Sequence, residues 1–289
     1  VIEWFASLGC SEAEVERSRK FDIAGYVGIP FPVISRESTM WLGKYLSLWL
    51  LWDDVHVEAL EHSWKIEANH VHTNCKPENM TLFDEGWWSL LRDFSTRRSA
   101  AWIERICNGM TIWSDAAVQE SLWIESHRSN GTLPTFADQM EMRIATIGMY
   151  VTADLIEECI DFELPNHFHA NPIVQQIRKI SNEIVGLGND IFSFGKDIFE
   201  EQINLVSTLM HERELSVDDA LEAVIFMHER ALEKFDRLAD SLESWGGELD
   251  EHVAKWLQYL RYASLGFTLW ESKAPRYTAH KIVIREQVI

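Results

Sequence analysis

Two segments of the chain carry oxygen-bearing side chains at spacings that could hold a divalent cation. The first, residues 53–58 (Asp-Asp-Val-His-Val-Glu), follows a strongly apolar run. Adjacent carboxylates after such a run must face water, a cation or a metal, because burying unpaired charge is costly. On a helix Asp54 and Glu58 share a face, whereas Asp53 is turned about 100° away from Asp54. A solvated helix end would explain this segment equally well.

The second segment places Asn189, Ser193 and Asp197 at positions i, i+4 and i+8, so that all three project from one face of a helix. An amide oxygen, a hydroxyl and a carboxylate are hard oxygen ligands of the kind that Mg²⁺ prefers. Lys196 lies beside them and would suit a phosphate. The alternative is an ordinary polar stripe, although Asn and Ser are modest helix formers in the middle of a helix.

Isolated cations lie elsewhere in the chain. Arg143 sits in a mostly apolar segment and needs an anionic partner, which could be a ligand, Glu141 or a neighbouring helix. Arg276 and Tyr277 follow the last long helix, and such a pair can bind a phosphate through a bidentate guanidinium and a phenol. Oxygen-bound metal ions and a few placed cations are how an acidic protein can bind a diphosphate.

The composition limits the partners. The 289 residues include 26 Lys and Arg against 46 Asp and Glu, a formal net charge of −20, which argues against nucleic acid and an anionic membrane surface. No apolar stretch is long enough to span a bilayer. The four cysteines form no CxxC pair, so neither a structural zinc site nor a disulfide framework is indicated, and we expect a cytoplasmic location. The chain begins without Met, which suggests a trimmed N-terminus.

Apolar residues recur at helical spacing nearly throughout, and helix breakers are scarce. Thr135 and Ser216 are typical helix caps. The abundant aromatic residues, among them 13 Trp and 14 Phe, could line a cavity that stabilises a carbocation without offering a nucleophile. We predict one all-α domain over residues 1–289, with helices over residues 39–62, 85–107, 115–128, 136–159, 171–199, 216–247 and 249–272.

Taken in order, these motifs resemble those of the class I terpene synthases, specifically the microbial single-domain terpene cyclases. Residues 53–58 resemble the DDxxxE variant of the family's first metal motif, and the Asn189 triad resembles its second, called NSE. Arg143 precedes Asn189 by 46 positions (189 − 143), the spacing of the family's pyrophosphate-sensor arginine. In the C-terminal part, Lys196 matches a diphosphate-binding lysine of the family, and Arg276 and Tyr277 match its RY pair. Trp270, six residues before Arg276, matches an aromatic position of the cavity in relatives.

The sequence departs from the family pattern at several positions. Asp197 replaces the usual Glu, and Glu58 lies one residue later than in DDxxD. Thr146 and Ile147 occupy the positions that couple the sensor to ionisation, where the first is often Asp, and Gly148 could supply a local helix break.

The resemblance implies an antiparallel helical bundle around a deep apolar cavity, and a carbon–oxygen lyase that ionises and cyclises a linear isoprenyl diphosphate, preferably farnesyl diphosphate. It implies three Mg²⁺ ions, with Mn²⁺ able to substitute, a monomer or homodimer, and central catalytic roles for Arg143, Asp53 and Asn189. The implied metal ligands are Asp53, Asp54, Glu58, Asn189, Ser193 and Asp197; the implied diphosphate ligands are Arg143, Lys196, Arg276 and Tyr277; the implied cavity walls are Trp270, Trp49 and Trp113.

Two other functions fit parts of this pattern. A prenyl-diphosphate synthase would share the fold and the metal chemistry, but such enzymes carry a second DDxxD motif where this chain has the Asn189 triad. A non-catalytic helical protein that binds an isoprenoid would share the fold, but a degenerate relative would be expected to have lost some of the polar ligands.

Overall fold

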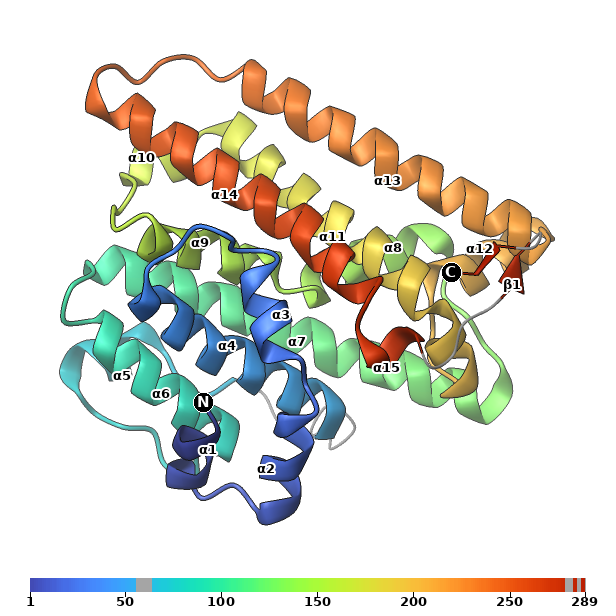
Figure 1. Ribbon diagram of the computed structural model, residues 1–289, viewed down its shortest axis with the longest axis horizontal. Coiled ribbons are helices and arrows are strands. Elements are labelled where there is room, and N and C mark those ends of the chain that lie inside the picture. The colour runs from blue at the N-terminus through green and yellow to red at the C-terminus, as the bar shows by residue number, and fades with distance from the viewer. Residues whose placement is uncertain (56–63, 279–282, 285–286, 289) are drawn as a thin grey trace.

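The computed structural model describes residues 1–55, 64–278, 283–284 and 287–288. Apart from one short pair of antiparallel strands, its regular structure is helical, which confirms the all-α prediction (Figure 1). The elements are α1 (Ile2–Leu8), α2 (Glu12–Arg19), α3 (Ile23–Gly28), α4 (Arg36–Val55), α5 (Ala68–Thr73), α6 (Leu82–Phe94), α7 (Ala100–Asn130), α8 (Phe136–Thr146), α9 (Met149–Cys159), α10 (Asn166–His169), α11 (Pro172–Phe199), α12 (Leu205–Arg213), α13 (Val217–Asp240), α14 (Glu248–Glu271), α15 (Pro275–Thr278), β1 (Val283–Ile284) and β2 (Gln287–Val288).

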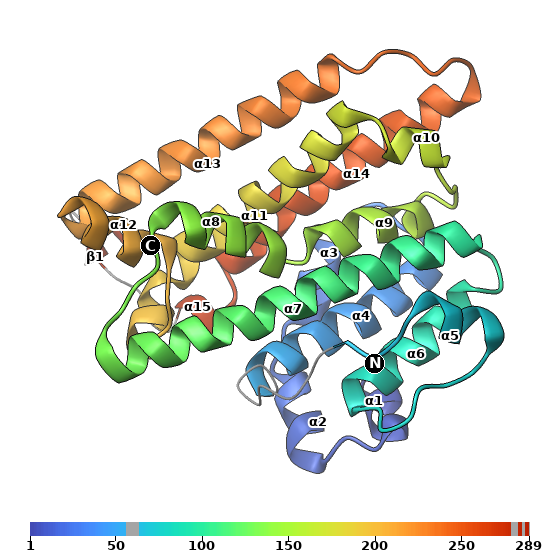
Figure 2. The same ribbon diagram turned by 180° about the vertical axis from the view of Figure 1, so that it is seen from behind.

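Helix α11 lies at the centre of the arrangement and contacts α8, α9, α12, α13, α14 and α15. Helices α13 and α14 run along it (Figure 1), and α8 and α9 lie between it and α7 (Figure 2). Its many partners explain its long apolar pattern, because nearly every turn buries side chains against a neighbouring helix. A residue on α11 can therefore meet residues from several other helices.

The predicted starts of three helices are confirmed by their caps. The Asn171 side chain accepts hydrogen bonds from the backbone N–H groups of Ile173 and Val174 at the start of α11. Thr135 and Ser216 cap α8 and α13 in the same way. These side chains satisfy N–H groups that have no partner inside the helix, which is why the sequence marks these positions clearly.

Several predicted helix boundaries are wrong. The helix expected over residues 85–107 ends at Phe94, and α7 starts anew after Ser99, whose hydroxyl accepts from the Trp102 backbone N–H. The helix expected over 115–128 is the second half of α7. The predicted helix over 39–62 begins at Arg36, and its last residues lie outside the described part of the chain. The break between Phe94 and Ser99 was not predicted, because the apolar periodicity continues across this short turn.

The predicted helix over residues 136–159 is two helices, and Gly148 supplies the break between them. Its φ of +82° is left-handed, a conformation that glycine adopts without steric cost. A Cβ atom at this position would also lie 2.4 Å from the Trp49 ring. Farther along, α13 ends at Asp240, before the predicted Gly246–Gly247 pair, which instead leads into α14. No described helix is both long and apolar enough to cross a bilayer.

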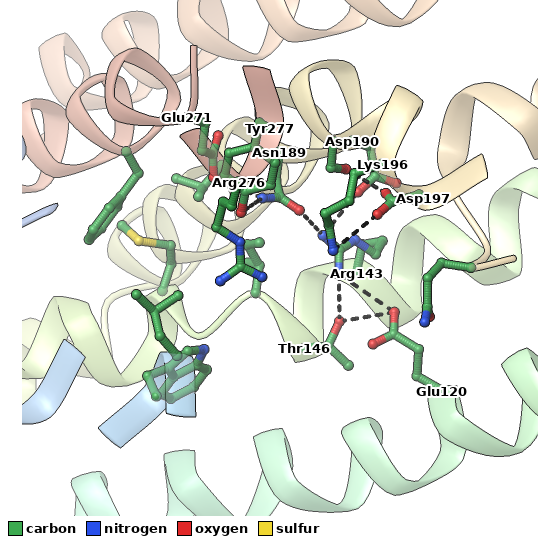
Figure 3. A pocket seen from close by; sticks show the side chains of 18 of the residues that line it. Glu120, Arg143, Thr146, Asn189, Asp190, Lys196, Asp197, Glu271, Arg276 and Tyr277 are labelled. Atoms are coloured by element: carbon green, nitrogen blue, oxygen red, sulfur yellow. Dashed lines mark hydrogen bonds and ion pairs between the residues drawn. The ribbon is translucent and has the colours of Figure 1, made fainter. Parts of the chain in front are cut away.

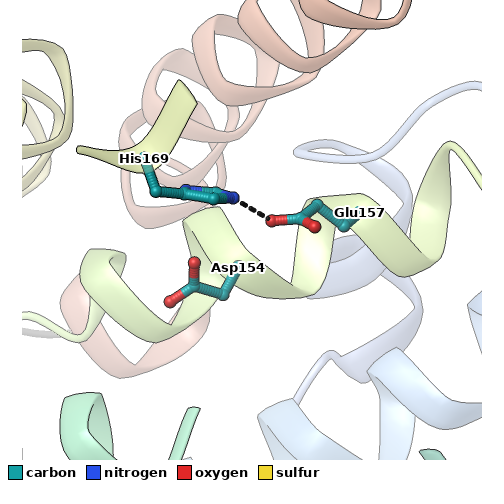
Figure 4. A group of neighbouring side chains, drawn as sticks. All are labelled: Asp154, Glu157 and His169. Atoms are coloured by element: carbon teal, nitrogen blue, oxygen red, sulfur yellow. Dashed lines mark ion pairs between the residues drawn. The ribbon is translucent and has the colours of Figure 1, made fainter. Parts of the chain in front are cut away.

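A buried ion-pair network joins α9 to α7, α10 and α11. Asp154, Glu157 and His169 lie together in it (Figure 4), and His169 Nε2 is 2.9 Å from Glu157 Oε1. Arg178 binds both Asp154 oxygens at 2.7 and 2.8 Å, and Arg105 contacts both carboxylates. Burial raises the pKa of Asp154, but the charge of Arg178 and its hydrogen bonds outweigh it and hold the pKa below the ordinary value. The arginines neutralise the carboxylates, so we interpret this cluster as structural.

Replacing Arg178 with Leu should destabilise the protein by about 3–5 kcal/mol, because Asp154 would remain as a buried charge with a weaker partner. Urea denaturation followed by circular dichroism measures the loss. The double variant Arg178→Leu/Asp154→Leu should lose less than the single variant. Arg230→Leu is the matched control, because its ion pair with Glu233 is more than half exposed and should be worth at most about 1 kcal/mol. Equal losses for the two single variants would contradict a special role for the buried pair.

Candidate active site

One cavity of about 640 Å³ opens between α4, α7, α8, α9, α11, α14 and α15 (Figure 3). One part of it is rich in charged side chains, and the other part is largely aromatic and aliphatic. The apolar part is lined by Tyr26, Tyr45, Leu46, Trp49, Met149, Val185 and Phe267, among others. A cavity of this kind suits a ligand with an anionic head and a hydrocarbon body.

Arg143 of α8 lies in the charged part and points at α11. Its Nη2 donates a 2.8 Å hydrogen bond to Asn189 Oδ1 and forms a 2.9 Å ion pair with Asp190 Oδ1. Glu141, the partner considered from the sequence, instead pairs with Lys179 on the exposed side of α8. The structure thus brings together Arg143 and Asn189, two predicted site residues that are 46 positions apart.

Asn189 also joins α11 to the C-terminal helices. Its Nδ2 donates to Glu271 Oε1 at 2.9 Å and to the Tyr277 hydroxyl at 3.3 Å. Burial raises the pKa of Glu271 to about 8, although the hydrogen bond from Asn189 opposes this shift. Glu271 Oε2 is buried and has no hydrogen-bond partner among the described residues. The predicted RY tyrosine therefore lies beside the predicted triad.

The oxygen atoms of the other two triad residues converge one turn farther along α11. Ser193 Oγ donates to Asp197 Oδ2 at 2.5 Å, and Asn204 Nδ2 donates to the same Asp197 oxygen at 2.8 Å. Neighbouring Asp190 is buried, and burial raises its pKa to about 6 against the opposing charge of Arg143. A crowded set of carboxylate, hydroxyl and amide oxygens that favours positive charge fits a hard divalent cation, so these residues could hold Mg²⁺.

The remaining predicted diphosphate ligands line the same cavity. Lys196 Nζ lies 3.5 Å from Asp197 Oδ1 and 3.2 Å from Glu200 Oε2. The Arg276 guanidinium lies 5.3 Å from the centre of the Tyr277 ring. All four predicted diphosphate ligands, Arg143, Lys196, Arg276 and Tyr277, are thus grouped around one space.

The first predicted metal motif lies at the described end of α4. Asp53 and Asp54 belong to its last turn, and each lies four residues after a residue that lines the cavity, Trp49 and Leu50 respectively. The side chains of Asp53 and Asp54, and the whole of Glu58, lie outside the described residues. Their role as metal ligands stays a prediction.

Of the three tryptophans predicted as cavity walls, only Trp49 lines the cavity. The prediction for Trp113 is wrong because its ring lies behind Trp49, 4.0 Å between centres, and its N–H donates to the Thr146 carbonyl at 2.9 Å. The prediction for Trp270 is wrong because its ring packs against that of Tyr26, 4.1 Å between centres, and lines a second cavity of about 370 Å³. One helix step, about 100°, separates Trp270 from Glu271, which does face the main cavity.

Sequence reasoning missed several residues that line the cavity. Asp190 and Glu271 lie directly beside predicted residues, so their position was a usable signal for both. Tyr26 belongs to the short helix α3, which periodicity did not reveal. Glu120 lies on α7 with no motif around it. These residues are placed by packing between helices, which a single sequence does not show.

The helical bundle thus contains a cavity with a charged end that could hold a metal-bound anion and an apolar end. Residues 44–234, more than half of the chain, match the family described as terpene synthase family 2, C-terminal metal binding. The chain belongs to this family.

Individual relatives agree with this assignment. The chain is 28% identical over 177 residues to 10-epi-cubebol synthase of Sorangium cellulosum, covering 61% of this chain and 55% of that protein. It is 24% identical over 198 residues to germacrene A synthase of Nostoc punctiforme, covering 68% of this chain and 60% of that protein. The matches therefore span little more than half the length of these two relatives.

Solved structures show the same fold. Linalool/nerolidol synthase from Streptomyces clavuligerus, in complex with 2-fluorogeranyl diphosphate, matches with a TM-score of 0.79 at 18% identity, over 93% of this chain and 95% of that one. Germacradien-4-ol synthase from Streptomyces citricolor matches with a TM-score of 0.75 at 18% identity, over 94% and 90% of the two chains.

Replacing Gly148 with Ala should lower stability by more than the roughly 1–2 kcal/mol expected for a left-handed residue alone, because the new methyl group would clash with Trp49. Gly131→Ala is the matched control: its φ is +74°, but a Cβ there meets no atom within 4 Å. Urea denaturation of both variants gives the comparison. Equal losses would show that contact between the helix break and Trp49 is unimportant.

Proposed function

We propose that this protein is a Mg²⁺-dependent terpene cyclase that ionises a linear isoprenyl diphosphate and cyclises the resulting cation. The contact between Arg143 and Asn189 is the observation that carries the proposal. It puts an anion-binding cation and a candidate metal ligand at the same end of a cavity whose other end is apolar. Family membership supports the same reaction class.

The charged end is suited to binding the diphosphate. Asn189, Ser193 and Asp197 would hold Mg²⁺, together with Asp53, Asp54 and Glu58. Bound Mg²⁺ supplies positive charge that stabilises the departing diphosphate. Arg143, Lys196, Arg276 and Tyr277 would donate hydrogen bonds to the same oxygens, and such donors favour ionisation because they meet charge where it develops.

The apolar end is suited to controlling the cation. Trp49 and Phe267 would present aromatic faces that attract positive charge, and the aliphatic Leu46 and Val185 offer no nucleophile. Exclusion of water by this lining would protect the cation from early capture. The last proton could pass to the diphosphate, so the mechanism does not require a separate base.

We favour farnesyl diphosphate as the substrate. Relatives include the two synthases above and a protein of Roseiflexus castenholzii named (+)-T-muurolol synthase ((2E,6E)-farnesyl diphosphate cyclizing), which is 25% identical over 194 residues. The structurally similar linalool/nerolidol synthase was solved with a geranyl analogue, so the test must cover more than one chain length.

The test is incubation with Mg²⁺ and, separately, geranyl, farnesyl and geranylgeranyl diphosphate, followed by gas chromatography–mass spectrometry of the organic extract. We expect a cyclic C15 product that is absent without Mg²⁺ and lost in Asn189→Ala. A cyclic product from another substrate would correct the chain length. Added isopentenyl diphosphate that yields a longer linear diphosphate would indicate a prenyl-diphosphate synthase. Diphosphate binding without turnover of any substrate would indicate a binding protein.

Asp197→Asn keeps the side-chain size but removes the charge of a proposed metal ligand. We expect the Mg²⁺ concentration for half-maximal turnover to rise by at least about tenfold, because losing a metal-site contact typically costs that much affinity. Titrating Mg²⁺ at saturating substrate measures the change. Glu243→Gln, an exposed residue, is the charge-matched control. An unchanged Mg²⁺ requirement in Asp197→Asn would remove Asp197 from the metal site.

A further inference from the structure

Glu120 brings a carboxylate to the charged end of the cavity from α7, on the other side of Arg143 from α11 (Figure 3). Its side chain is only 15% exposed. Its Oε1 lies 3.6 Å from Arg143 Nη1 and accepts a 3.4 Å hydrogen bond from Thr146 Oγ1. Neither the motifs nor the composition of the chain pointed to this residue.

Glu120 and Asp190 contact different terminal nitrogens of the Arg143 guanidinium. The Nη2 end makes short contacts to α11, 2.8 Å to Asn189 and 2.9 Å to Asp190. The Nη1 end makes longer contacts, 3.5 Å to Thr146 and 3.6 Å to Glu120. A planar guanidinium held by carboxylates at both ends has a defined orientation, whereas one held at a single end can rotate.

Thr146 connects this arrangement to the cavity wall. It is the last residue of α8 and directly precedes Ile147 and the break at Gly148. Ile147 and Met149, on either side of the break, line the cavity. Thr146 carries a neutral hydroxyl, so the charge that balances the Nη1 end of Arg143 in this contact comes from Glu120.

We propose that Glu120 is a positioning residue that orients Arg143 toward the diphosphate and links it, through Thr146, to the helix break. The proposal rests on the proposed function, because it assigns Arg143 to the diphosphate. Without the Glu120 carboxylate, the guanidinium would be drawn toward Asp190, its closer carboxylate partner, and away from the leaving group. Glu120 acts through Arg143 and takes no part in the chemical step itself.

The test compares Glu120→Gln, the double variant Glu120→Gln/Thr146→Asp, and Asp115→Asn, an exposed acid on the same helix, as control. The double variant returns a carboxylate to Arg143 from three residues away on α8, a spacing at which side chains meet. Steady-state turnover gives kcat and KM, calorimetry gives the affinity for inorganic pyrophosphate with Mg²⁺, and circular dichroism melts verify folding.

For Glu120→Gln we expect kcat to fall at least about tenfold while KM changes less than about threefold, because full charge on the leaving group develops only on ionisation. Pyrophosphate carries that charge, so its affinity should fall at least about threefold. The double variant should recover most of both losses, and Asp115→Asn should match the wild type. Recovery by a carboxylate on another helix is a result that a merely structural Glu120 would not give.

A folded Glu120→Gln with unchanged kcat and pyrophosphate affinity would overturn the proposal, as would tighter pyrophosphate binding or a double variant no better than the single one. In these outcomes the wild type still turns over substrate, so they would not contradict the proposed function. A wild type that binds pyrophosphate without turnover would contradict the cyclase activity, and the pyrophosphate affinities of the variants would then decide the role of Glu120. A wild type with neither turnover nor pyrophosphate binding would overturn both proposals.

Discussion

The charged end of the cavity depends on the placement of Arg143 against Asn189 and Asp190. This contact ties α8 to α11, and the other side of the Asn189 amide ties α11 to Glu271 and Tyr277. A guanidinium, an amide and buried carboxylates can share this space because their hydrogen bonds and ion pairs form a common network. The central position of α11 makes the network possible, since it touches the helices that supply every partner.

The helix break at Gly148 joins this polar network to the apolar part. A continuous helix over residues 136–159 would carry Thr146 and Met149 on through regular turns, whereas the left-handed glycine redirects the chain beside Trp49. The same segment carries Arg143 on one side of the break. On the other side it carries Thr152, whose hydroxyl is hydrogen-bonded to the Tyr45 hydroxyl. The charged end of the cavity and the shape of its apolar wall therefore depend on one short stretch of backbone.

The sequence predicted the fold class and the residues whose roles follow from local spacing. Asn189, Ser193 and Asp197 share a helix face by periodicity alone, and Asn171, Thr135 and Ser216 cap helices through contacts within three residues. Trp113 and Trp270 were misplaced because burial does not reveal which side of a helix faces a cavity. Glu120 and Tyr26 were missed because only the packing of distant helices brings them to the cavity. Asn204 was missed because it meets Asp197 only through the turn that follows α11.

In the proposed function, Asn189 and Arg143 bind one diphosphate, the first through a metal and the second directly. A crystal structure of the protein with Mg²⁺ and inorganic pyrophosphate tests it most directly. We expect a metal ion within coordination distance of Asn189, Ser193 and Asp197, and we expect Arg143 to donate hydrogen bonds to a pyrophosphate oxygen on that metal. Pyrophosphate bound elsewhere, such as in the second cavity beside Lys20 and Trp270, would contradict it.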